Sequence, residues 1–380
     1  MKTIKRLSIV LSVLLLTIFV LSSCQLFLGD DPDDNPRGIF ETIWNDFDRT
    51  YALFEHKNID WQGVYNKYSP LITDNMSQSE LFSALTAMLS ELMDDHVWLD
   101  GRGEYHYEYD SRWPRIDYGV NDNFNFNTIR DYHVDFTSID HDGFSYGTFE
   151  SNSNIGYLRI HTFSGSNGIF METGDWAKEI DSILQSLADT DGLVLDVRNN
   201  GGGFPSNFTY IHNRFASQQA DYLSVSTKTG PGRNEFSTPL LRTIKPADTR
   251  YTKPTVLLTN GWSVSSTESF TLALRTQEHI THVGTNTNGA LSTRVPRPLI
   301  NGWYYTISIQ RTADIDGVCY ERSSLTEAGI PPEILIPSDV QEERWDPVWN
   351  DEYQIWDSVY TEGYDKQLEG ALDELLKKIN

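Results

Sequence analysis

The amino-acid sequence predicts an α/β protein with a layered core, in which helices flank a mainly parallel sheet. From Ile155 onward, strand-like and helix-like patterns alternate along the chain. Two of these strands, 192–198 and 255–259, have a continuous apolar centre, Leu-Val-Leu and Val-Leu-Leu, as is typical of strands buried on both faces. Each ends in a turn of small or polar residues, and the carboxyl ends of parallel strands are where sites form in such sheets.

The chain begins with a pattern typical of an export signal. Three basic residues lie within the first six, an apolar run covers 7–21, and Leu-Ser-Ser-Cys follows at 21–24. This resembles the bacterial lipoprotein signal, which implies that 1–23 is removed and that Cys24 is lipidated. The resemblance implies a lipid-anchored protein of the cell envelope, at the outer membrane or cell surface. A signal peptide cut elsewhere is the alternative. Cys319 is the other cysteine, so no disulfide is expected.

The charge balance excludes one class of partner. The formal net charge is −24, which makes binding to nucleic acid or to anionic headgroups unfavourable. Much of the predicted tether, 24–38, is acidic. Its run at 29–34 is interpreted as a solvated linker, since nothing fixes its carboxylates for a metal.

A small helical domain is expected over 39–100. Its clearest helix opens with a capping box at Ser77–Glu80 and ends near Met93. His96 follows two carboxylates there, so it is either a base or a surface loop histidine. An irregular or short-stranded connector is expected over 101–150.

The core is expected over 151–340. A strand over 155–163 is followed by a helix near 176–187, and further helices are expected at 205–215 and after Ser265. Shorter strands at 281–284, 291–296 and 303–310 are expected to complete the core. The C-terminal segment, 341–380, is expected to be helical, with leucines at helical spacing on a closing helix.

The turns that follow these two strands both carry groups that could form a functional site. The turn at 263–267 carries several hydroxyls and leads into a helix, a layout that raises a serine to the mouth of the sheet. The three glycines at 201–203 let a backbone approach a ligand closely, but they lack the spacing of phosphate-binding loops. Asp196 and Arg198 are expected to brace this turn.

Three motifs, at 193–203, 263–268 and 327–333, resemble those of the C-terminal-processing, or tail-specific, serine peptidases. The resemblance implies a ClpP/crotonase-like core and places the nucleophile on Ser265. Ala290 stands where the lysine-dependent branch has its general base. The tricorn-like branch instead takes a histidine from a Leu-x-Asp-x-His pattern, and residues 92–96 fit it, which implies that His96 is the base. Glu327 or Glu321 would complete the relay, and neither has the family's register.

The implied reaction is acyl transfer on peptide substrates. His96 takes a proton from Ser265 during attack on a peptide carbonyl, and the backbone N–H groups of Gly202 and Ser266 stabilise the oxyanion. No cofactor or metal is expected, because the sequence holds no His-x-x-x-His or Cys-x-x-Cys pair. The alternative is a catalytically inactive, peptide-binding lipoprotein with the same fold, which Ala290 favours. A lipase is disfavoured because no Gly-x-Ser-x-Gly elbow surrounds Ser265.

Overall fold

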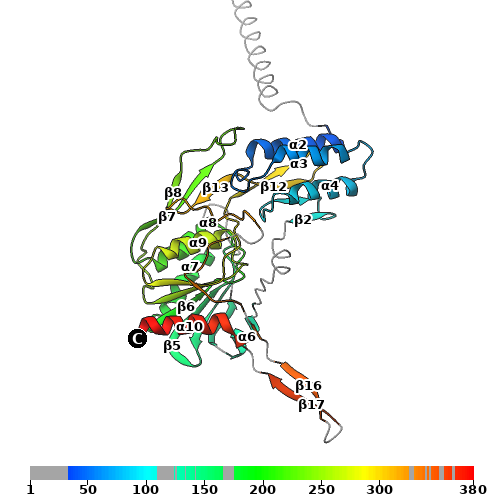
Figure 1. Ribbon diagram of the computed structural model, residues 1–380. Helices are drawn as coiled ribbons and strands as arrows, with labels where there is room; N and C mark the ends of the chain where they lie inside the picture. The colour runs from blue at the N-terminus through cyan, green and yellow to red at the C-terminus, as the bar shows by residue number, and fades with distance from the viewer. Residues whose placement is uncertain are drawn as a thin grey trace, which may run out of the picture.

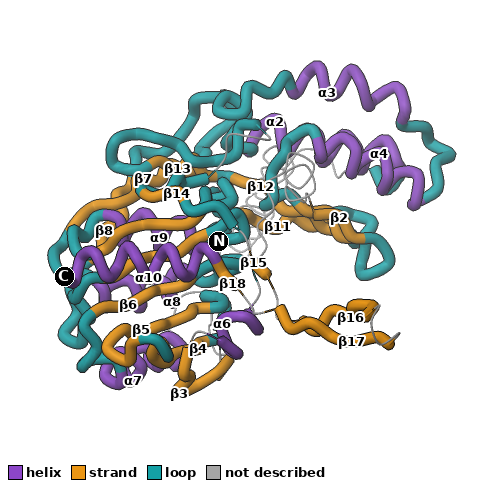
Figure 2. The backbone as a smooth tube through the Cα atoms, turned by 60° about the horizontal axis from the view of Figure 1, so that its bottom comes forward, coloured by secondary structure: helices purple, strands orange, loops and turns teal. Residues whose placement is uncertain are grey.

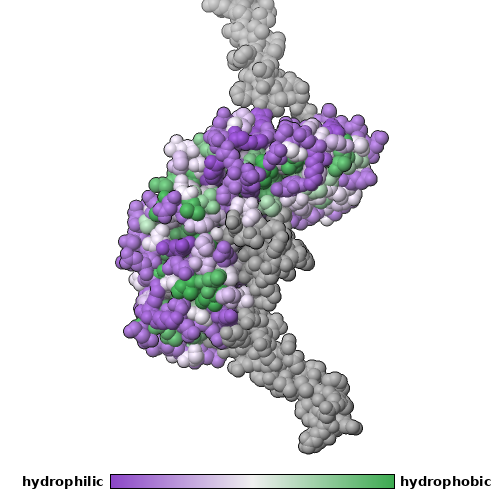
Figure 3. Space-filling view, viewed as in Figure 1, coloured by the Kyte–Doolittle hydropathy of each residue, from purple (hydrophilic) through white to green (hydrophobic). Residues whose placement is uncertain are grey.

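The computed structural model describes residues 33–108, 124, 126–132, 134–141, 143–165, 175–324, 329–338, 340–341, 344–350, 355–361 and 364–380. The expected signal peptide, Cys24 and most of the acidic tether lie outside these ranges. Within them, no helix has both the length and the apolar character needed to cross a membrane. Two main parts pack together, an N-terminal layer and a larger α/β part (Figure 1). Hydrophilic residues cover much of the face seen in Figure 3.

A seven-stranded sheet forms the centre of the α/β part. Its order is β14 (Ile334–Leu335), β10 (Ile280–Gly284), β9 (Thr255–Thr259), β6 (Gly192–Asp196), β5 (Asn152–Ile160), β4 (Phe144–Phe149) and β3 (Val134–His141). The first five strands are parallel, and β4 and β3 join antiparallel. Strands β6 and β9 are buried along their whole length. The predicted α/β class with a mainly parallel sheet is confirmed.

Helices cover both faces of this sheet (Figure 2). On one face lie α7 (Asp175–Ser186), α8 (Pro205–His212) with the short η2 turn (Asn213–Phe215), and α9 (Ser266–Arg275). They share an apolar core with Leu193, Leu195 and Leu257. On the other face, α6 (Phe126–Tyr132) and α10 (Lys366–Ile379) pack with the alternate residues Val194, Val256 and Leu258. Because side chains alternate between the two faces of β6 and β9, these strands contribute to two separate hydrophobic cores.

The N-terminal layer contains α2 (Pro36–Thr50), α3 (Trp61–Tyr68), the η1 turn (Ser69–Leu71) and α4 (Gln78–Ser90). Helix α4 begins with the expected capping box of Ser77 and Glu80. These helices pack against a second sheet, in the order β11 (Arg294–Pro298), β12 (Tyr304–Ser308), β1 (Trp98–Asp100) and β2 (His106–Glu108). The layer is thus completed by a hairpin from late in the chain.

The structure differs from several expectations. The strands near 291–296 and 303–310 were expected to complete the core, but β11 and β12 pair with β1 and β2, and Leu299, Trp303, Tyr305 and Ile307 pack against the N-terminal helices. The expected irregular or short-stranded connector over 101–150 includes β3 and β4, which extend the central sheet. In the expected helical segment, 341–380, α10 is the helix among the described residues.

Residues before α10 form strands instead of a helix. Strands β16 (Arg344–Asn350) and β17 (Ile355–Thr361) make a hairpin, and β15 (Val340–Gln341) pairs with β18 (Tyr364–Asp365). Pro347 lies within β16, and a proline in a helix interior removes a hydrogen bond and clashes with the preceding turn. A further three-stranded sheet contains β13 (Gln310–Ala313), β7 (Ala220–Thr227) and β8 (Leu240–Ile244).

Candidate active site

Ser265 occupies a strained turn between β9 and α9. Its φ is 60° and its ψ is −117°, outside the regions that a residue with a Cβ prefers. The side chain is half-buried, and no hydrogen bond among the described residues has the Ser265 hydroxyl as its donor. Ser263, by contrast, donates its hydroxyl to the carbonyl of Val197 at 2.8 Å, so it holds the turn in place. The geometry therefore leaves Ser265 as the serine available for chemistry.

Glu268 fixes this turn from within α9. One carboxylate oxygen accepts from the Ser265 amide at 2.9 Å and from the Ala290 amide at 2.9 Å. The other accepts from the Thr287 hydroxyl and the Gly289 amide, each at 2.7 Å. The side chain is fully buried, and burial raises the pKa of Glu268 although these donors oppose the rise. Glu268 thus joins the Ser265 turn to the loop that carries Gly289 and Ala290.

The glycine turn lies directly against Ser265. The carbonyl of Asn200 accepts from the Val264 amide and from the Thr267 hydroxyl, both at 3.0 Å. Gly202 has a φ of 92°, and a Cβ there would lie 2.9 Å from the Cβ of Ser265 and 3.0 Å from the Ser266 nitrogen. Only glycine fits such a position, because both the space and the backbone conformation exclude a side chain.

The two expected oxyanion donors are adjacent but differ in their bonding. The Gly202 amide donates to Oδ1 of Asn200 at 2.9 Å. The Ser266 amide, in the first turn of α9, has no acceptor among the residues that the structure describes. An amide at a helix start that lacks an internal partner can bind an anion.

His96 enters the site from the N-terminal layer. The chain leaves α4 through Met93, which has a positive φ of 46°, and Oδ1 of Asp94 accepts from the His96 amide at 2.9 Å. The His96 carbonyl accepts from the Thr306 hydroxyl at 2.6 Å, which attaches this segment to β12. Asp94 also accepts from the Tyr51 hydroxyl at 2.8 Å.

The imidazole of His96 is buried and neutral. Burial lowers its pKa to about 4; the carboxylate of Asp94 and the carbonyl of Ser292 oppose the shift, whereas the charges of Arg294 and Lys57 add to it. A neutral imidazole is the form that can accept a proton. Among the described residues its Nδ1 has no hydrogen-bond partner, and no hydrogen bond joins the ring to Ser265.

Lys57 connects the histidine segment to the α/β part. It is 5% exposed, and its ammonium donates to the Met93 carbonyl at 3.1 Å and to the Arg322 carbonyl at 2.5 Å. Arg322 in turn donates its amide to the Gly289 carbonyl at 2.8 Å. Since Gly289 is bonded to Glu268, one continuous set of contacts runs from the histidine segment to the nucleophile turn.

Glu321 is the glutamate that the structure brings to this cluster. Its side chain is buried, and its Oε1 has no partner among the residues described. Burial and the negative charge of Asp94 raise the pKa of Glu321 well above its usual range, while Lys57 opposes the rise. The other candidate, Glu327, lies outside the described residues.

Asp196 and Arg198 brace the glycine turn, as the sequence suggested. Their side chains pair at 2.7 Å, and Arg198 also pairs with Asp365 at 2.9 Å, all three being fully buried. The contact with Asp365 joins the end of β6 to the start of α10.

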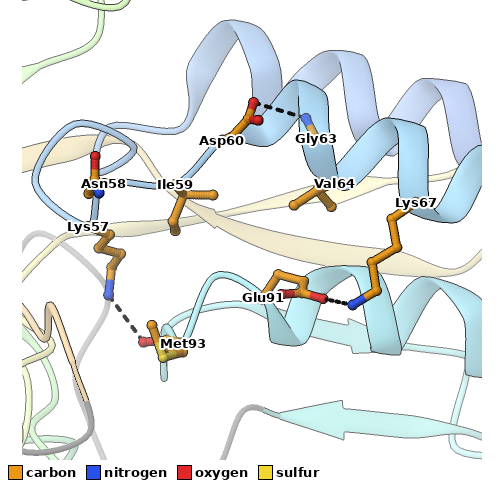
Figure 4. Close-up of a pocket in the computed structure, with 9 residues that line it drawn as sticks. All are labelled: Lys57, Asn58, Ile59, Asp60, Gly63, Val64, Lys67, Glu91 and Met93. Carbon is orange, nitrogen blue, oxygen red and sulfur yellow. Dashed lines mark hydrogen bonds and ion pairs between the residues drawn. The ribbon is translucent and has the colours of Figure 1, made fainter.

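A pocket of about 400 Å³ lies beside the site, within the N-terminal layer (Figure 4). It shares Lys57 and Met93 with the histidine segment but contains neither Ser265 nor His96. In Figure 4 the Lys57 ammonium points to the Met93 carbonyl, away from Lys67, which pairs with Glu91 at 2.5 Å. The pocket is therefore a neighbour of the candidate site.

Sequence reasoning missed the roles of Glu268, Lys57 and Arg322. Glu268 stands three residues after Ser265, the capping-box spacing, so that pattern could have indicated its bond to the Ser265 amide. Lys57 donates to the backbone carbonyl groups of Met93 and Arg322, and such contacts with the backbone leave no signal in a sequence.

The fold and site together define a peptidase-like α/β protein, with a strained serine turn at the end of a parallel strand. Comparisons with known proteins agree. The profile described as peptidase family S41 matches residues 154–336, and that of the tricorn protease C1 domain matches residues 32–90. The core of the chain is thus similar to peptidase family S41, and its N-terminal part is similar to the tricorn protease C1 domain.

Two curated relatives come from Bacillus subtilis. The carboxy-terminal processing proteases CtpA and CtpB are each 24% identical to this chain, over 185 and 182 residues. Each match covers 48% of this chain, and it spans only about a third of the relatives' own length, 35% and 34%.

Solved structures match over more of the chain. A structure from Parabacteroides merdae, described as a candidate peptidase, is 27% identical with a TM-score of 0.71, covering 90% of this chain and 98% of its own. Mature CPAF is 13% identical with a TM-score of 0.60, covering 80% and 92%. The likeness to CPAF shows the fold alone.

Proposed function

We propose that the protein is a serine peptidase that hydrolyses peptide bonds in exported proteins or peptides. The observation that carries this proposal is the turn at Ser265, where a serine with a strained backbone lies against a glycine turn and beside the Ser266 amide, which has no acceptor among the described residues. The match to the peptidase family S41 profile and the matches to processing proteases support hydrolysis of peptide bonds.

In the proposed reaction, the Ser265 hydroxyl attacks the peptide carbonyl carbon and transfers its proton to neutral His96. The oxygen of the tetrahedral intermediate accepts from the Ser266 amide, and from the Gly202 amide in exchange for its bond to Asn200. The protonated His96 then gives its proton to the leaving amine, and water releases the acyl group by the same steps. The proposed reaction requires a hydrogen bond between the Ser265 hydroxyl and the His96 imidazole in the substrate complex.

We assign the positioning of His96 to Glu321 in this reaction. Both side chains are buried, both have an unpartnered polar atom among the described residues, and both interact with Asp94 and Lys57. A carboxylate near the imidazole stabilises its protonated form after proton transfer. Glu321→Gln should lower kcat more than it changes KM.

The test is cleavage of a peptide library by the purified full chain, read by mass spectrometry beside Ser265→Ala and His96→Ala. Both variants should lose at least about 10⁴-fold in kcat, because nucleophile and base act as a unit. Ser263→Ala is the matched serine control and should retain cleavage at the same bonds.

Cleavage that survives in Ser265→Ala would overturn the assignment of the nucleophile. If the folded wild-type chain cleaves nothing but retains library peptides, the chain is a peptide-binding protein with a peptidase fold. Labelling of Ser265 by a fluorophosphonate, located by peptide mapping, tests the reactivity of that serine directly.

Lipid anchoring through Cys24 is a separate proposal, supported by the Leu-Ser-Ser-Cys pattern alone. Cells fed radiolabelled palmitate should label the wild-type chain and Cys319→Ser, and should leave Cys24→Ser unlabelled and outside the membrane pellet. Label on Cys24→Ser would refute this anchor and the envelope location that follows from it.

A further inference from the structure

The outer face of the sheet formed by β11, β12, β1 and β2 lies beside His96. Trp98 stands opposite Glu108 in the register of β1 and β2, two residues after His96. The inner residues of the same strands, Leu99 and Tyr305 among them, pack against the N-terminal helices. The outer face therefore carries the alternate side chains, which include Trp98, Glu108 and Tyr304.

Arg294 covers Trp98 on this face. Its guanidinium carbon lies 3.6 Å from the centre of the Trp98 ring, a cation–π contact that fixes the side chain and leaves its N–H groups to other partners. Arg294 is exposed, and Trp98 is half-buried beneath it.

No hydrogen bond or ion pair joins Arg294 to any residue that the structure describes. Other arginines of this acidic chain hold a carboxylate: Arg198 holds Asp196, Arg214 holds Asp181 and Arg297 holds Asp46. Glu108 acts on Arg294 electrostatically without forming an ion pair with it. Arg294 is thus a partly desolvated cation whose N–H groups have no acceptor among the described residues.

The segment carrying Arg294 passes the candidate base. The His96 carbonyl accepts from the Thr306 hydroxyl on β12, and Thr306 lies opposite Pro296, two residues after Arg294 on β11. Arg294, stacked on Trp98, therefore lies on the same sheet as the segment of the candidate base, on the path of a peptide that extends from it. Five N–H donors in a planar fork match a carboxylate, and Glu108 nearby disfavours a more highly charged anion.

We propose that Arg294, stacked on Trp98, is a specificity residue that binds a carboxylate of the peptide substrate. The carboxylate is either the C-terminal group or an aspartate or glutamate side chain. This inference rests on the proposed peptidase function and names a substrate class for it.

The experiment compares three versions of one cleaved peptide: the free acid, its C-terminal amide, and the free acid with every Asp and Glu changed to Asn and Gln. The kcat/KM of each is measured for the full-length wild-type chain, Arg294→Gln and Arg297→Gln. Arg297 is the matched control, since it lies on the same strand and already holds Asp46.

Wild type should favour one carboxylate-bearing peptide over its neutral version by about tenfold, the size of one charge-assisted contact. The neutral version that is cleaved more slowly identifies the carboxylate that Arg294 binds. Slower cleavage of the C-terminal amide indicates the C-terminal carboxylate, and slower cleavage of the Asn/Gln version indicates side-chain carboxylates. Arg294→Gln should reduce the ratio to about one, and Arg297→Gln should keep it. Rates are compared on each variant's pH plateau, because loss of Arg294 also raises the pKa of His96.

An equal ratio in wild type and Arg294→Gln would overturn the proposal, as would a wild type that cleaves all three peptides alike. Binding of the same peptides to Ser265→Ala and to Ser265→Ala with Arg294→Gln, followed by fluorescence polarisation, separates the two proposals. If the wild type cleaves nothing, a carboxylate preference in binding that requires Arg294 still supports this subsite.

Discussion

The nucleophile side and the base side of the site are built in different ways. Ser265 is held by neighbours from the α/β part, and Glu268 alone joins its amide to two other backbone amides and a hydroxyl. His96 belongs to another layer, and its segment is attached through the Lys57 ammonium and the Thr306 hydroxyl. The proposed nucleophile is held by its own turn, whereas the position of the proposed base depends on how two layers pack.

The largest expected effect lies on the nucleophile side. Glu268→Gln replaces one carboxylate oxygen by an NH₂ group that faces two N–H or O–H donors, so buried donors lose their acceptor. We expect a loss of about 3 kcal/mol in the free energy of unfolding, measured in urea, and at least about 100-fold in kcat.

Glu80→Gln is the matched control, because Glu80 holds the same capping-box position at the start of α4 and is exposed. It should leave the free energy of unfolding nearly unchanged, because the side chain is exposed. Equal losses in both variants would show that Glu268 is only a helix cap.

The base side should respond differently, through its titration. Lys57→Met removes the ammonium that joins the Met93 and Arg322 carbonyls, and kcat should fall about tenfold with little change in KM. Because the Lys57 charge lowers the pKa of His96, its loss should also move the acid limb of kcat/KM to higher pH.

Lys67→Met, which removes an exposed lysine on the rim of the same pocket, should leave both kcat and the pH limb unchanged. If Lys57→Met lowers kcat without moving the limb, Lys57 is a structural residue only.

The smallest effect concerns the wild-type pH profile. Activity requires neutral His96, and burial lowers its pKa to about 4, so kcat/KM should persist as pH falls below the ordinary imidazole value of about 6.5. The measurement is kcat/KM against pH, with circular dichroism at each pH to confirm folding. A limb centred at or above about 6.5 would mean that His96 is more exposed to water than this packing allows.

Local motifs allowed much of this site to be predicted. The strand at 255–259, the helix after Ser265 and the positions of Ser265 and His96 all follow from short stretches of sequence. Alternation at 294–298 and 304–308 indicates strands, but it does not specify the sheet that they join, which depends on distant helices. The hydrogen bond from the Gly202 amide to Asn200 and the contacts of Lys57 could not be predicted, because they depend on three-dimensional geometry alone.

The buried ion pair of Arg198 and Asp365 joins two residues that are synthesised at different times. These residues are 167 positions apart, so at roughly 5–20 residues per second Asp365 is synthesised roughly ten to thirty seconds after Arg198. Until then the guanidinium beside the glycine turn lacks one of its two carboxylate partners, and α10 cannot cover its face of the sheet. A nascent chain would therefore lack part of the packing behind the glycine turn until Asp365 and α10 have been made.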